Sequence, residues 1–255
     1  LVGRTVVEAW VSPDAPRLVQ GETPDSFCRR LAGRIIAEVD RRGKYLLLRV
    51  DGGLTWIVHL RMTGGLIHLR GSRPDERFLR ARFRLDDGSE LCYADMRKLG
   101  TMWLVADESE VVGRLGPEPL DEAFGPEQLR AALAGRSAPV KAVIMDQAAV
   151  AGIGNIYADE SLFEAGIRPR KAARRLSRVA VERLHGAVRR VLAEALDNRG
   201  SSFRNYVDGE GEQGMHQLRV KVFRRMGEPC YVCGTAIKRI KVGGRGTHYC
   251  PRCQR

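Results

Sequence analysis

The sequence predicts an α+β protein of several domains: an antiparallel β-sandwich first, a helical region second and a metal-binding β-hairpin last. Three observations support this order. Short β-type runs separated by glycine turns fill roughly the first 105 residues, an apolar helical period follows from Pro126, and two Cys-x-x-Cys pairs close the chain. At 255 residues, the chain is long enough for two domains with hydrophobic cores in addition to the hairpin.

Two hairpin signals define the β-rich part. In each, apolar runs flank a short turn that contains Asp and Gly, which is a strong local signal for a hairpin. The expected strands are 44–50 and 54–60 around Asp51-Gly52-Gly53, 82–85 and 91–94 around Asp86-Asp87-Gly88, and 101–105. Such short strands predict a sandwich or barrel of antiparallel sheets.

Helix signals begin after Leu115-Gly-Pro-Glu-Pro-Leu120, a segment that interrupts any regular element. The expected helices run from Pro126 to Gly135, around 140–144, from Asn155 as N-cap to about residue 165, and from Ser177 to Gly200, followed by a mobile polar loop at 201–214. The predicted domains are 1–114 for the β-sandwich, 115–122 for a linker, 123–214 for the helical domain and 215–255 for the metal-binding hairpin.

Four cysteines near the end of the chain predict the metal site. They are Cys230, Cys233, Cys250 and Cys253, arranged as two Cys-x-x-Cys pairs with sixteen residues between them. Each pair can supply two thiolates to one tetrahedral, structural Zn²⁺. The alternatives are two disulfides, or a zinc knuckle that only stabilises the end of the chain. Cys28 and Cys92 are isolated thiols in apolar settings, which fits a reducing, cytoplasmic environment.

The metal-binding segment is strongly basic. Between His216 and Arg255, ten Lys and Arg residues accompany one acid, Glu228, so this part carries +9 of the chain's net +12. Strands expected at 237–242 and 247–249 place Arg245 in the turn between them. A positive block of this density indicates phosphate binding. Nucleic acid is favoured over a membrane surface, because the sequence shows no amphipathic helix with exposed aromatic residues and no apolar run of transmembrane length.

Other candidate residues each have a simpler alternative. Gly154-Asn155 precedes a helix, where free N–H groups and the helix dipole attract anions, but Asn is also a common N-cap. Lys44 opens an apolar strand and can face either a sugar–phosphate or solvent. Met62, beside a Gly-Gly turn, is either an apolar wedge for a base stack or core filler. Arg97-Lys98-Leu99, in a tight loop, permits the same two interpretations.

Six segments, taken in order, resemble those of a known family. They are Arg42-Gly-Lys-Tyr45, His59-Leu-Arg-Met62, Asp95-Met-Arg-Lys98, Leu115-Gly-Pro-Glu-Pro-Leu120, Gly154-Asn-Ile-Tyr-Ala-Asp-Glu-Ser-Leu-Phe163 and Gly244-Arg-Gly-Thr-His-Tyr-Cys-Pro-Arg-Cys-Gln254. The pattern resembles the formamidopyrimidine-DNA glycosylases, bacterial base-excision repair enzymes for oxidised purines, over essentially the whole chain. The resemblance implies a β-sandwich, a helix–two-turn–helix domain and a zinc finger in a monomer that binds damaged double-stranded DNA in the bacterial cytoplasm, associated with the nucleoid.

The resemblance also implies a mechanism. The damaged nucleotide is flipped out of the duplex, and the amine of an N-terminal proline attacks C1′ to form a Schiff base. The base leaves, and β- and then δ-elimination cut the strand. In this comparison Lys44 matches the lysine associated with β-elimination, and Arg245 matches the finger arginine that grips phosphates and is linked to δ-elimination.

The DNA-binding positions are likewise carried over from the resemblance. Met62, Arg97 and the position of Leu99 match three residues that fill the gap left by the flipped base. Basic and polar DNA contacts and the zinc ligands complete the set. They are Lys98, Lys141, Gly154, Asn155 and Arg245 for DNA, and Cys230, Cys233, Cys250 and Cys253 for zinc.

The sequence departs from the family pattern at several positions. The family begins Pro-Glu-Leu-Pro-Glu-Val-Glu, whereas Leu1 stands just after the expected end of that helix, so we expect these 255 residues to be part of a longer protein. Leu99 replaces a usual Phe, Phe78 replaces a phosphate-contacting His, and Val222-Phe-Arg-Arg225 replaces Val-Tyr-Gly-Arg. Two alternatives stay open: a glycosylase for oxidised pyrimidines that resembles endonuclease VIII, and a non-catalytic binder of damaged DNA.

Overall fold

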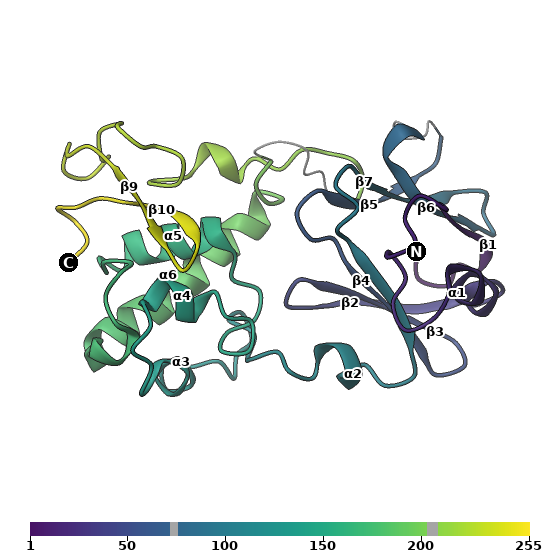
Figure 1. Cartoon of the computed structure of the whole chain (residues 1–255), viewed down its shortest axis with the longest axis horizontal. Coiled ribbons are helices and arrows are strands. Elements are labelled where there is room, and N and C mark those ends of the chain that lie inside the picture. The colour runs from purple at the N-terminus through teal and green to yellow at the C-terminus, as the bar shows by residue number, and fades with distance from the viewer. Residues whose placement is uncertain (72–75, 203–208) are drawn as a thin grey trace. The chain divides into compact units, whose positions relative to one another are not determined.

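The structure, a computed structural model, describes residues 1–71, 76–202 and 209–255. It divides into two compact units. Unit 1 comprises Leu1–Gly113 with Arg199–Gly214, and unit 2 comprises Arg114–Asn198 with Met215–Arg255. Figure 1 labels most of the helices and strands of both units. Among the described residues, no helix is long and apolar enough to cross a membrane.

Unit 1 contains two four-stranded antiparallel sheets, with strand orders β1-β6-β7-β5 and β2-β3-β4-β8. The strands are β1 Val6–Val11, β2 Ile36–Arg42, β3 Tyr45–Val50, β4 Leu54–His59, β5 Gly64–Leu69, β6 Leu79–Leu85, β7 Glu90–Asp95 and β8 Thr101–Val105. Two α-helices, α1 Pro24–Leu31 and α2 Ser109–Val112, and a 3₁₀ turn, η1 Glu76–Phe78, complete the unit. Both predicted hairpins are present, and the expected antiparallel β-architecture is confirmed.

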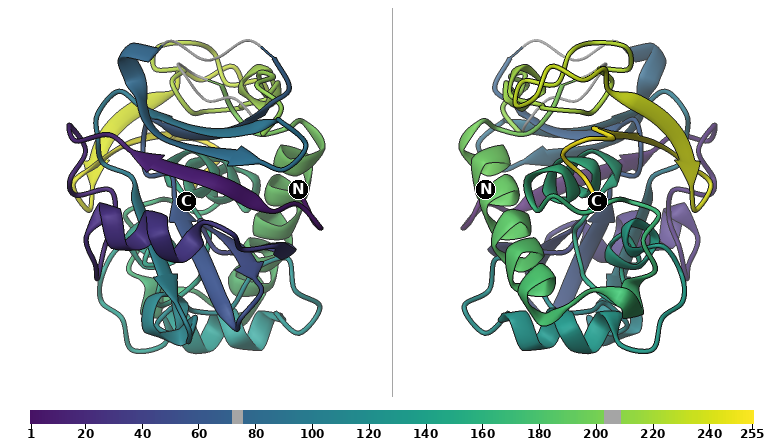
Figure 2. Two further views of the ribbon diagram at one scale, coloured as in Figure 1. Left: turned by 90° about the vertical axis from the view of Figure 1, so that its right-hand side faces the viewer. Right: turned by 90° about the vertical axis from the view of Figure 1, so that its left-hand side faces the viewer.

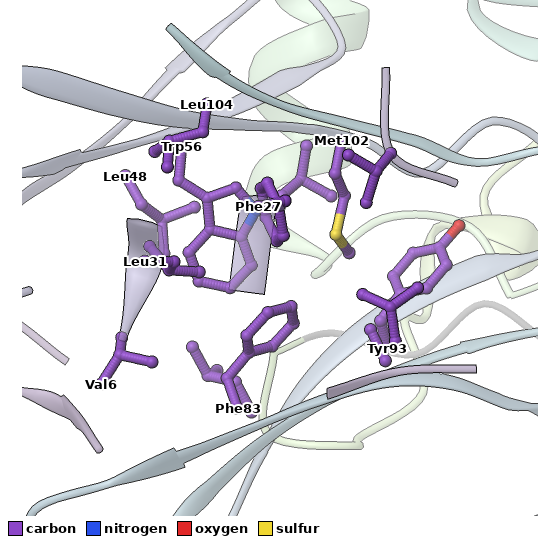
Figure 3. Packing of buried hydrophobic residues seen from close by; sticks show 14 of the residues in the cluster. Val6, Phe27, Leu31, Leu48, Trp56, Phe83, Tyr93, Met102 and Leu104 are labelled. Atoms are coloured by element: carbon purple, nitrogen blue, oxygen red, sulfur yellow. The ribbon is translucent and has the colours of Figure 1, made fainter. Parts of the chain in front are cut away.

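The core of unit 1 lies between its two sheets, where α1 contributes two further buried side chains. Trp56 from one sheet and Phe83 from the other pack with ring centroids 4.3 Å apart, and Phe27 of α1 lies 6.3 Å from each of them. All three side chains are fully buried, as Figure 3 shows. Two sheets that bury one face each against the other form a sandwich, and this core holds the strand ends in fixed register.

Several elements of unit 1 have weak signals in the sequence. The edge strand β2 is exposed along most of its length and therefore lacks the alternation of a half-buried strand. Helix α1 does carry a start signal that the sequence analysis missed: Thr23 caps it by accepting a hydrogen bond from the Ser26 N–H (3.2 Å), and Pro24 occupies the first turn. Strands β1 and β5 were also not expected.

Unit 2 packs four α-helices and a β-hairpin. Its elements are α3 Pro126–Leu133, α4 Val140–Ile144, α5 Asn155–Glu164, α6 Arg178–Asp197, the 3₁₀ turns η2 Ala173–Arg175 and η3 His216–Leu218, and strands β9 Lys238–Val242 and β10 Arg245–Tyr249. The predicted cap of the long helix is confirmed, because Ser177 Oγ accepts from the Ala180 N–H (3.3 Å). Buried apolar side chains of α3, α4, α5 and α6 form one cluster. Figure 2, right, shows α6 in green and the hairpin in yellow.

Helix α5 contributes one buried side chain to the small core of the hairpin segment. Phe163, from α5, packs with Val222, Ile237, Cys230 and Cys250 in a small separate cluster. Two of the five fully packed members of this cluster are candidate metal ligands, so the segment has little apolar core of its own. Small modules of this kind obtain their folding free energy from the ion they bind.

Two details differ from the sequence-based expectation. Gly154, not Asn155, is the N-cap of α5, and Asn155 is the first helical residue. The loop after α6 was expected to belong to the helical domain, but its described part belongs to unit 1, where the His68 N–H donates to the Gly209 carbonyl (2.8 Å). Residues 203–208 of that loop lie outside the described residues. The finer division into four domains stays a prediction.

Candidate nucleic-acid interface and metal centre

The four C-terminal cysteines converge on one point. Their Sγ atoms all lie within 4.8 Å of one another, with Cys233 and Cys250 3.4 Å apart and Cys230 and Cys253 3.9 Å apart. A disulfide would require about 2.05 Å, whereas two ligands of a tetrahedral Zn²⁺ with Zn–S bonds of about 2.3 Å lie roughly 3.8 Å apart. The geometry therefore fits one zinc ion and excludes the two-disulfide alternative.

One of the four thiols, that of Cys233, has a lowered pKa because of hydrogen bonds within its own loop. Hydrogen bonds from Thr235 lower the pKa of the Cys233 thiol to about 6. Burial raises the pKa of Cys250. Because the thiolate is the metal ligand, Cys233 supplies an ionised sulfur near neutral pH, and the cation would then favour ionisation of the remaining three.

The turn between β9 and β10 presents Arg245 at the tip of the hairpin. Gly243 and Gly244 have φ angles of 53° and 76°, the left-handed conformation that a two-residue hairpin turn of this type requires at both positions. Arg245 begins β10 opposite Val242 and is exposed. A Cβ on Gly243 would lie 3.2 Å from Ala142 Cβ, so the turn rests directly on α4. The predicted pairing of 237–242 with 247–249 is confirmed, but β9 begins at Lys238 and β10 at Arg245, so Arg245 opens a strand and does not lie in the turn as expected.

Asn155 and Arg245 belong to one local structure. The Asn155 side chain, at the start of α5, donates from Nδ2 to the carbonyl of Gly246 (3.1 Å), the residue that follows Arg245. Its Oδ1 atom is buried and has no hydrogen-bond partner in the described part of the chain. The positive end of the helix dipole also lies at the N-terminal end of α5. These features place a cation, a polar amide and a helix N-terminus together.

Lys141 does not fit its predicted role as a DNA contact. Its side chain is fully buried, and Nζ forms an ion pair with Asp159 Oδ1 (2.7 Å), which is equally buried. The same ammonium donates to Thr247 Oγ1 (2.7 Å) and to the Gly246 carbonyl (3.2 Å). Burial lowers the pKa of Lys141, and the Asp159 carboxylate opposes that shift. Lys141 therefore holds the β9–β10 hairpin through buried contacts, and its ammonium group is not available at the surface.

In unit 1 the predicted wedge residues lie on two neighbouring turns. Met62, 65% exposed, stands between β4 and β5, and the exposed Arg97-Lys98-Leu99 stands between β7 and β8. Sheet pairing brings the turns together, because Gly64 pairs with Asp95 and His59 pairs with Thr101. Exposed apolar side chains at a turn are available to contact a ligand, and core filler would be buried. The core alternative is therefore excluded for Met62 and Leu99.

Lys44 belongs to the same end of unit 1. It is exposed and precedes Tyr45, which pairs with His59 across the β3–β4 hairpin. His59 is 9% exposed, and burial together with the charges of Arg61 and Lys44 lowers its pKa to about 4. His59 is therefore neutral at pH 7, and its Nδ1 accepts a hydrogen bond from the Arg61 N–H (3.0 Å). Topology thus gathers Lys44, Met62 and the Arg97–Leu99 turn.

A cavity of about 300 Å³ lies behind the Arg97–Leu99 turn. Its lining includes the cations Arg17, Arg80 and Lys98 along with Asp14 and Asp95. The three cations outnumber the two carboxylates in this lining, so the cavity favours an anionic group over a cationic one.

Comparison with known proteins decides the family. Models of the formamidopyrimidine-DNA glycosylase N-terminal domain, the formamidopyrimidine-DNA glycosylase H2TH domain and the zinc finger found in FPG and IleRS match residues 1–102, 115–206 and 227–255. A formamidopyrimidine-DNA glycosylase of Symbiobacterium thermophilum is 47% identical over 258 residues, covering 100% of this chain and 84% of that protein. One from Bacillus subtilis is 42% identical over 235 residues, covering 91% and 85%.

This chain belongs to the formamidopyrimidine-DNA glycosylase family. It is therefore related to base-excision repair enzymes with DNA glycosylase and AP lyase activity. The fold agrees. A mutant of Lactococcus lactis Fpg in complex with DNA containing Fapy-dG matches with a TM-score of 0.91 and 33% identity, covering 100% of this chain and 93% of that one. The MutM (Fpg) protein of Thermus thermophilus matches with 0.88 and 38%, covering 100% and 92%.

Two acids in the α5 motif explain why this glycosylase motif is specific. Asp159 accepts from the His248 N–H (2.8 Å) in addition to pairing with Lys141, and so fixes β10. Glu160 accepts from the N–H groups of Lys221, Val222 and Phe223 (2.7–3.0 Å), and so fixes the segment ahead of the zinc finger. Both residues lie in the segment that resembles the family, but no role for them was predicted from the sequence. Adjacent acids inside an otherwise apolar helix were the available signal, because buried carboxylates need donors.

Proposed function

We propose that this protein excises oxidised purines from duplex DNA, with unit 2 gripping the phosphate backbone and unit 1 filling the gap left by the flipped base. Lys44 serves β-elimination and Arg245 serves phosphate binding and δ-elimination. The protein acts as a monomer with one structural zinc ion, in the bacterial cytoplasm at the nucleoid.

One observation carries the phosphate-binding half of this proposal. The Asn155 amide bonds to the Gly246 carbonyl (3.1 Å), which ties the N-terminal end of α5 to the residue after exposed Arg245. Guanidinium groups and helix N-termini are both preferred phosphate partners, and joining them creates one binding platform. The chain's net charge of +12 supports a polyanionic ligand.

The gap-filling half rests on the character of the exposed residues in unit 1. Met62 and Leu99 supply apolar wedges, and Arg97 between them in sequence supplies a planar cation that can stack on or hydrogen-bond to a base. A base flipped from the stack leaves an apolar void, and filling that void offsets part of the few kcal/mol that flipping costs.

Salt dependence separates the two tasks experimentally. Arg245→Ala should weaken binding to damaged and intact duplexes alike and reduce the slope of log K against log salt by about one unit, because one phosphate contact is lost. Met62→Ala should leave that slope unchanged and reduce the preference for damaged DNA. Arg130→Ala is the charge-matched control, since this exposed arginine of α3 pairs with Glu127 (2.6 Å) away from the platform. An equal change of slope in all three variants would refute the division of tasks.

Lesion class is tested by borohydride trapping. A form of the protein with the family's Pro-Glu-Leu-Pro-Glu-Val-Glu segment placed ahead of Leu1 is assayed on duplexes that carry an oxidised purine or an oxidised pyrimidine. We expect a covalent adduct mainly with the purine lesion. A preference for the pyrimidine would favour the alternative that resembles endonuclease VIII, and binding without any adduct would favour the non-catalytic alternative.

A further inference from the structure

The two wedge turns of unit 1 both contain strained backbone. Arg61, before Met62, has φ 56°, and Lys98, before Leu99, has φ 52°. Residues with a Cβ rarely adopt this left-handed conformation, and they keep it only where neighbouring contacts hold them there. Contacts within unit 1 must therefore keep Arg61 and Lys98 in this conformation.

The carboxylate of Asp95 provides that support for the second turn. It is 1% exposed. Its Oδ1 accepts from the Arg97 N–H (3.0 Å), and its Oδ2 accepts from the Leu99 N–H (2.8 Å) and the Gly100 N–H (2.9 Å). A buried carboxylate is costly unless donors surround it, and here the donors are the backbone of the wedge turn itself.

The same carboxylate also reaches the first turn. Thr63, the residue after Met62, donates its hydroxyl to Asp95 Oδ1 (2.5 Å). A second feature joins the turns: Gly64 and Gly100, one from each, both face the hydroxyl of Tyr93, and a Cβ on either would overlap with it. Tyr93 in turn donates to Asp95 Oδ2 (3.3 Å). The two turns therefore share one support.

We infer that the Thr63–Asp95 hydrogen bond makes the two wedge turns act as one unit, so that Met62 and Leu99 enter the DNA together. Thr63 and Asp95 are positioning residues in this arrangement, since neither side chain lies at the exposed tip of its turn. The inference rests on the wedge roles given under Proposed function. It adds that recognition of damage depends on a coupling inside unit 1 that contacts no DNA.

A double-mutant cycle tests the coupling. Met62→Ala, Leu99→Ala and the double variant are compared for the ratio of binding to lesion-containing and intact duplex, first with Thr63 and then in the Thr63→Val background. Thr63→Val keeps the shape of the side chain and removes its hydroxyl. With Thr63 present, the effects of the two alanine substitutions on the ratio should be non-additive by about threefold or more. In the Thr63→Val background they should become additive, and Thr63→Ser should restore the coupling.

A second measurement reports directly on the insertion of the wedge residues into the base stack. 2-Aminopurine placed next to the lesion brightens when its neighbour is unstacked, and Thr63→Val should reduce this signal at saturating protein. Thr55→Val is the matched control: Thr55 is buried in the same unit and donates to Glu108 (2.9 Å), outside the two turns. It should leave both the cycle and the fluorescence unchanged.

The outcomes separate this inference from the proposed function. If the unsubstituted protein shows no preference for the lesion duplex, the wedge roles themselves fail. If it does show the preference but the cycle is equally non-additive with Thr63→Val, or already additive with Thr63 present, the wedge roles stand and the coupling is refuted. An effect of Thr55→Val as large as that of Thr63→Val would also overturn it.

Discussion

Unit 1 and unit 2 each organise a proposed DNA-binding surface around one buried aspartate, but they neutralise its charge differently. In unit 1 Asp95 accepts hydrogen bonds from backbone N–H groups and two hydroxyls, and no cation pairs with its carboxylate among the described residues. In unit 2 Asp159 pairs with the buried ammonium of Lys141. The first arrangement shapes a flexible backbone turn, and the second locks two secondary-structure elements together.

The difference matches what each surface has to do. A carboxylate that is bound by main-chain donors sets the conformation of the turn that carries Leu99, so the wedge geometry follows from local hydrogen bonds. An ion pair between α4 and α5 that also holds β10 fixes the position of the zinc finger, which is too small to hold itself. Unit 1 therefore depends on its own core, whereas the zinc finger of unit 2 depends on a metal and on a charge pair in the neighbouring helices.

Removal of zinc should give the largest difference between the units. Metal binding by a structural site of this type contributes about 10–16 kcal/mol in small zinc modules, so chelation or Cys250→Ser should unfold the finger and abolish high-affinity DNA binding. Unit 1 should be unaffected. All three tryptophans, Trp10, Trp56 and Trp103, lie in unit 1, so their fluorescence provides the check. A fully reduced, zinc-free protein with undiminished DNA affinity would contradict this.

Breaking the buried ion pair should have the next largest effect. Lys141→Met leaves Asp159 buried without its cation and should lower the free energy of unfolding of unit 2 by about 3–5 kcal/mol. Adding Asp159→Asn should recover much of the loss, because the orphan charge is removed and an acceptor remains for the His248 N–H. Urea unfolding followed by circular dichroism at 222 nm measures this, since most helices are in unit 2.

Lys221→Met is the matched control for that experiment. Lys221 lies in the same unit and is 3.5 Å from Glu164, but its side chain is 43% exposed. An exposed pair of this kind is worth about 0–1 kcal/mol. A loss as large as that from Lys141→Met would mean that burial of the Lys141–Asp159 pair is not what makes it important.

Lowering the pH should reduce the free energy of unfolding of unit 1 through His59, and this should be the smallest of the three predicted effects on stability. The pKa of His59 is about 4 in the folded protein and near 6.5 when unfolded, so the unfolded state binds more protons between these values. The contribution to stability is therefore complete above pH 6.5 and lost as pH falls toward 4. From pH 7.5 to pH 5 unfolding of unit 1, followed by tryptophan fluorescence, should become easier by about 2 kcal/mol.

His59→Gln should flatten this pH dependence, because the titrating group is gone. Protonation of Nδ1 also removes the acceptor for the Arg61 N–H, which shapes the Met62 turn. In the folded protein this protonation occurs only near pH 4, so the lesion preference should persist at pH 5, where stability has already fallen, and decline near pH 4. An unchanged slope of stability against pH in His59→Gln would show that other groups titrate there.

Much of this protein could be predicted from local patterns. The hairpin turns, the Ser177 cap and the Cys-x-x-Cys spacing each depend on neighbours in sequence, and the structure confirms them. Strand β2 could not be found in this way, because an exposed edge strand carries no alternation to detect. Helix α1 is short, and its Thr23-Pro24 start was the only strong local signal.

The residues of the candidate site can likewise be separated into those that the sequence predicts and those that it does not. Residue type and order were enough to predict Met62, Arg97, Asn155, Arg245 and the zinc ligands as candidates, because their chemistry suits phosphates, base stacks and metals. Sequence could not tell an exposed cation from a buried one, so Lys141 was expected at the surface. Whether a lysine is buried or exposed depends on whether the fold brings a carboxylate from another element close to its ammonium group.

The sequence by itself determined the fold class, the family and the metal, since these follow from turn chemistry, motif order and ligand spacing. Only the tertiary structure decided which charges pair and which turns touch. Thr63 meets Asp95 across 32 positions of chain, and Lys141 meets Thr247 across 106. Contacts of this length have no local signature, because they form only when packing of the cores brings distant segments within hydrogen-bonding distance.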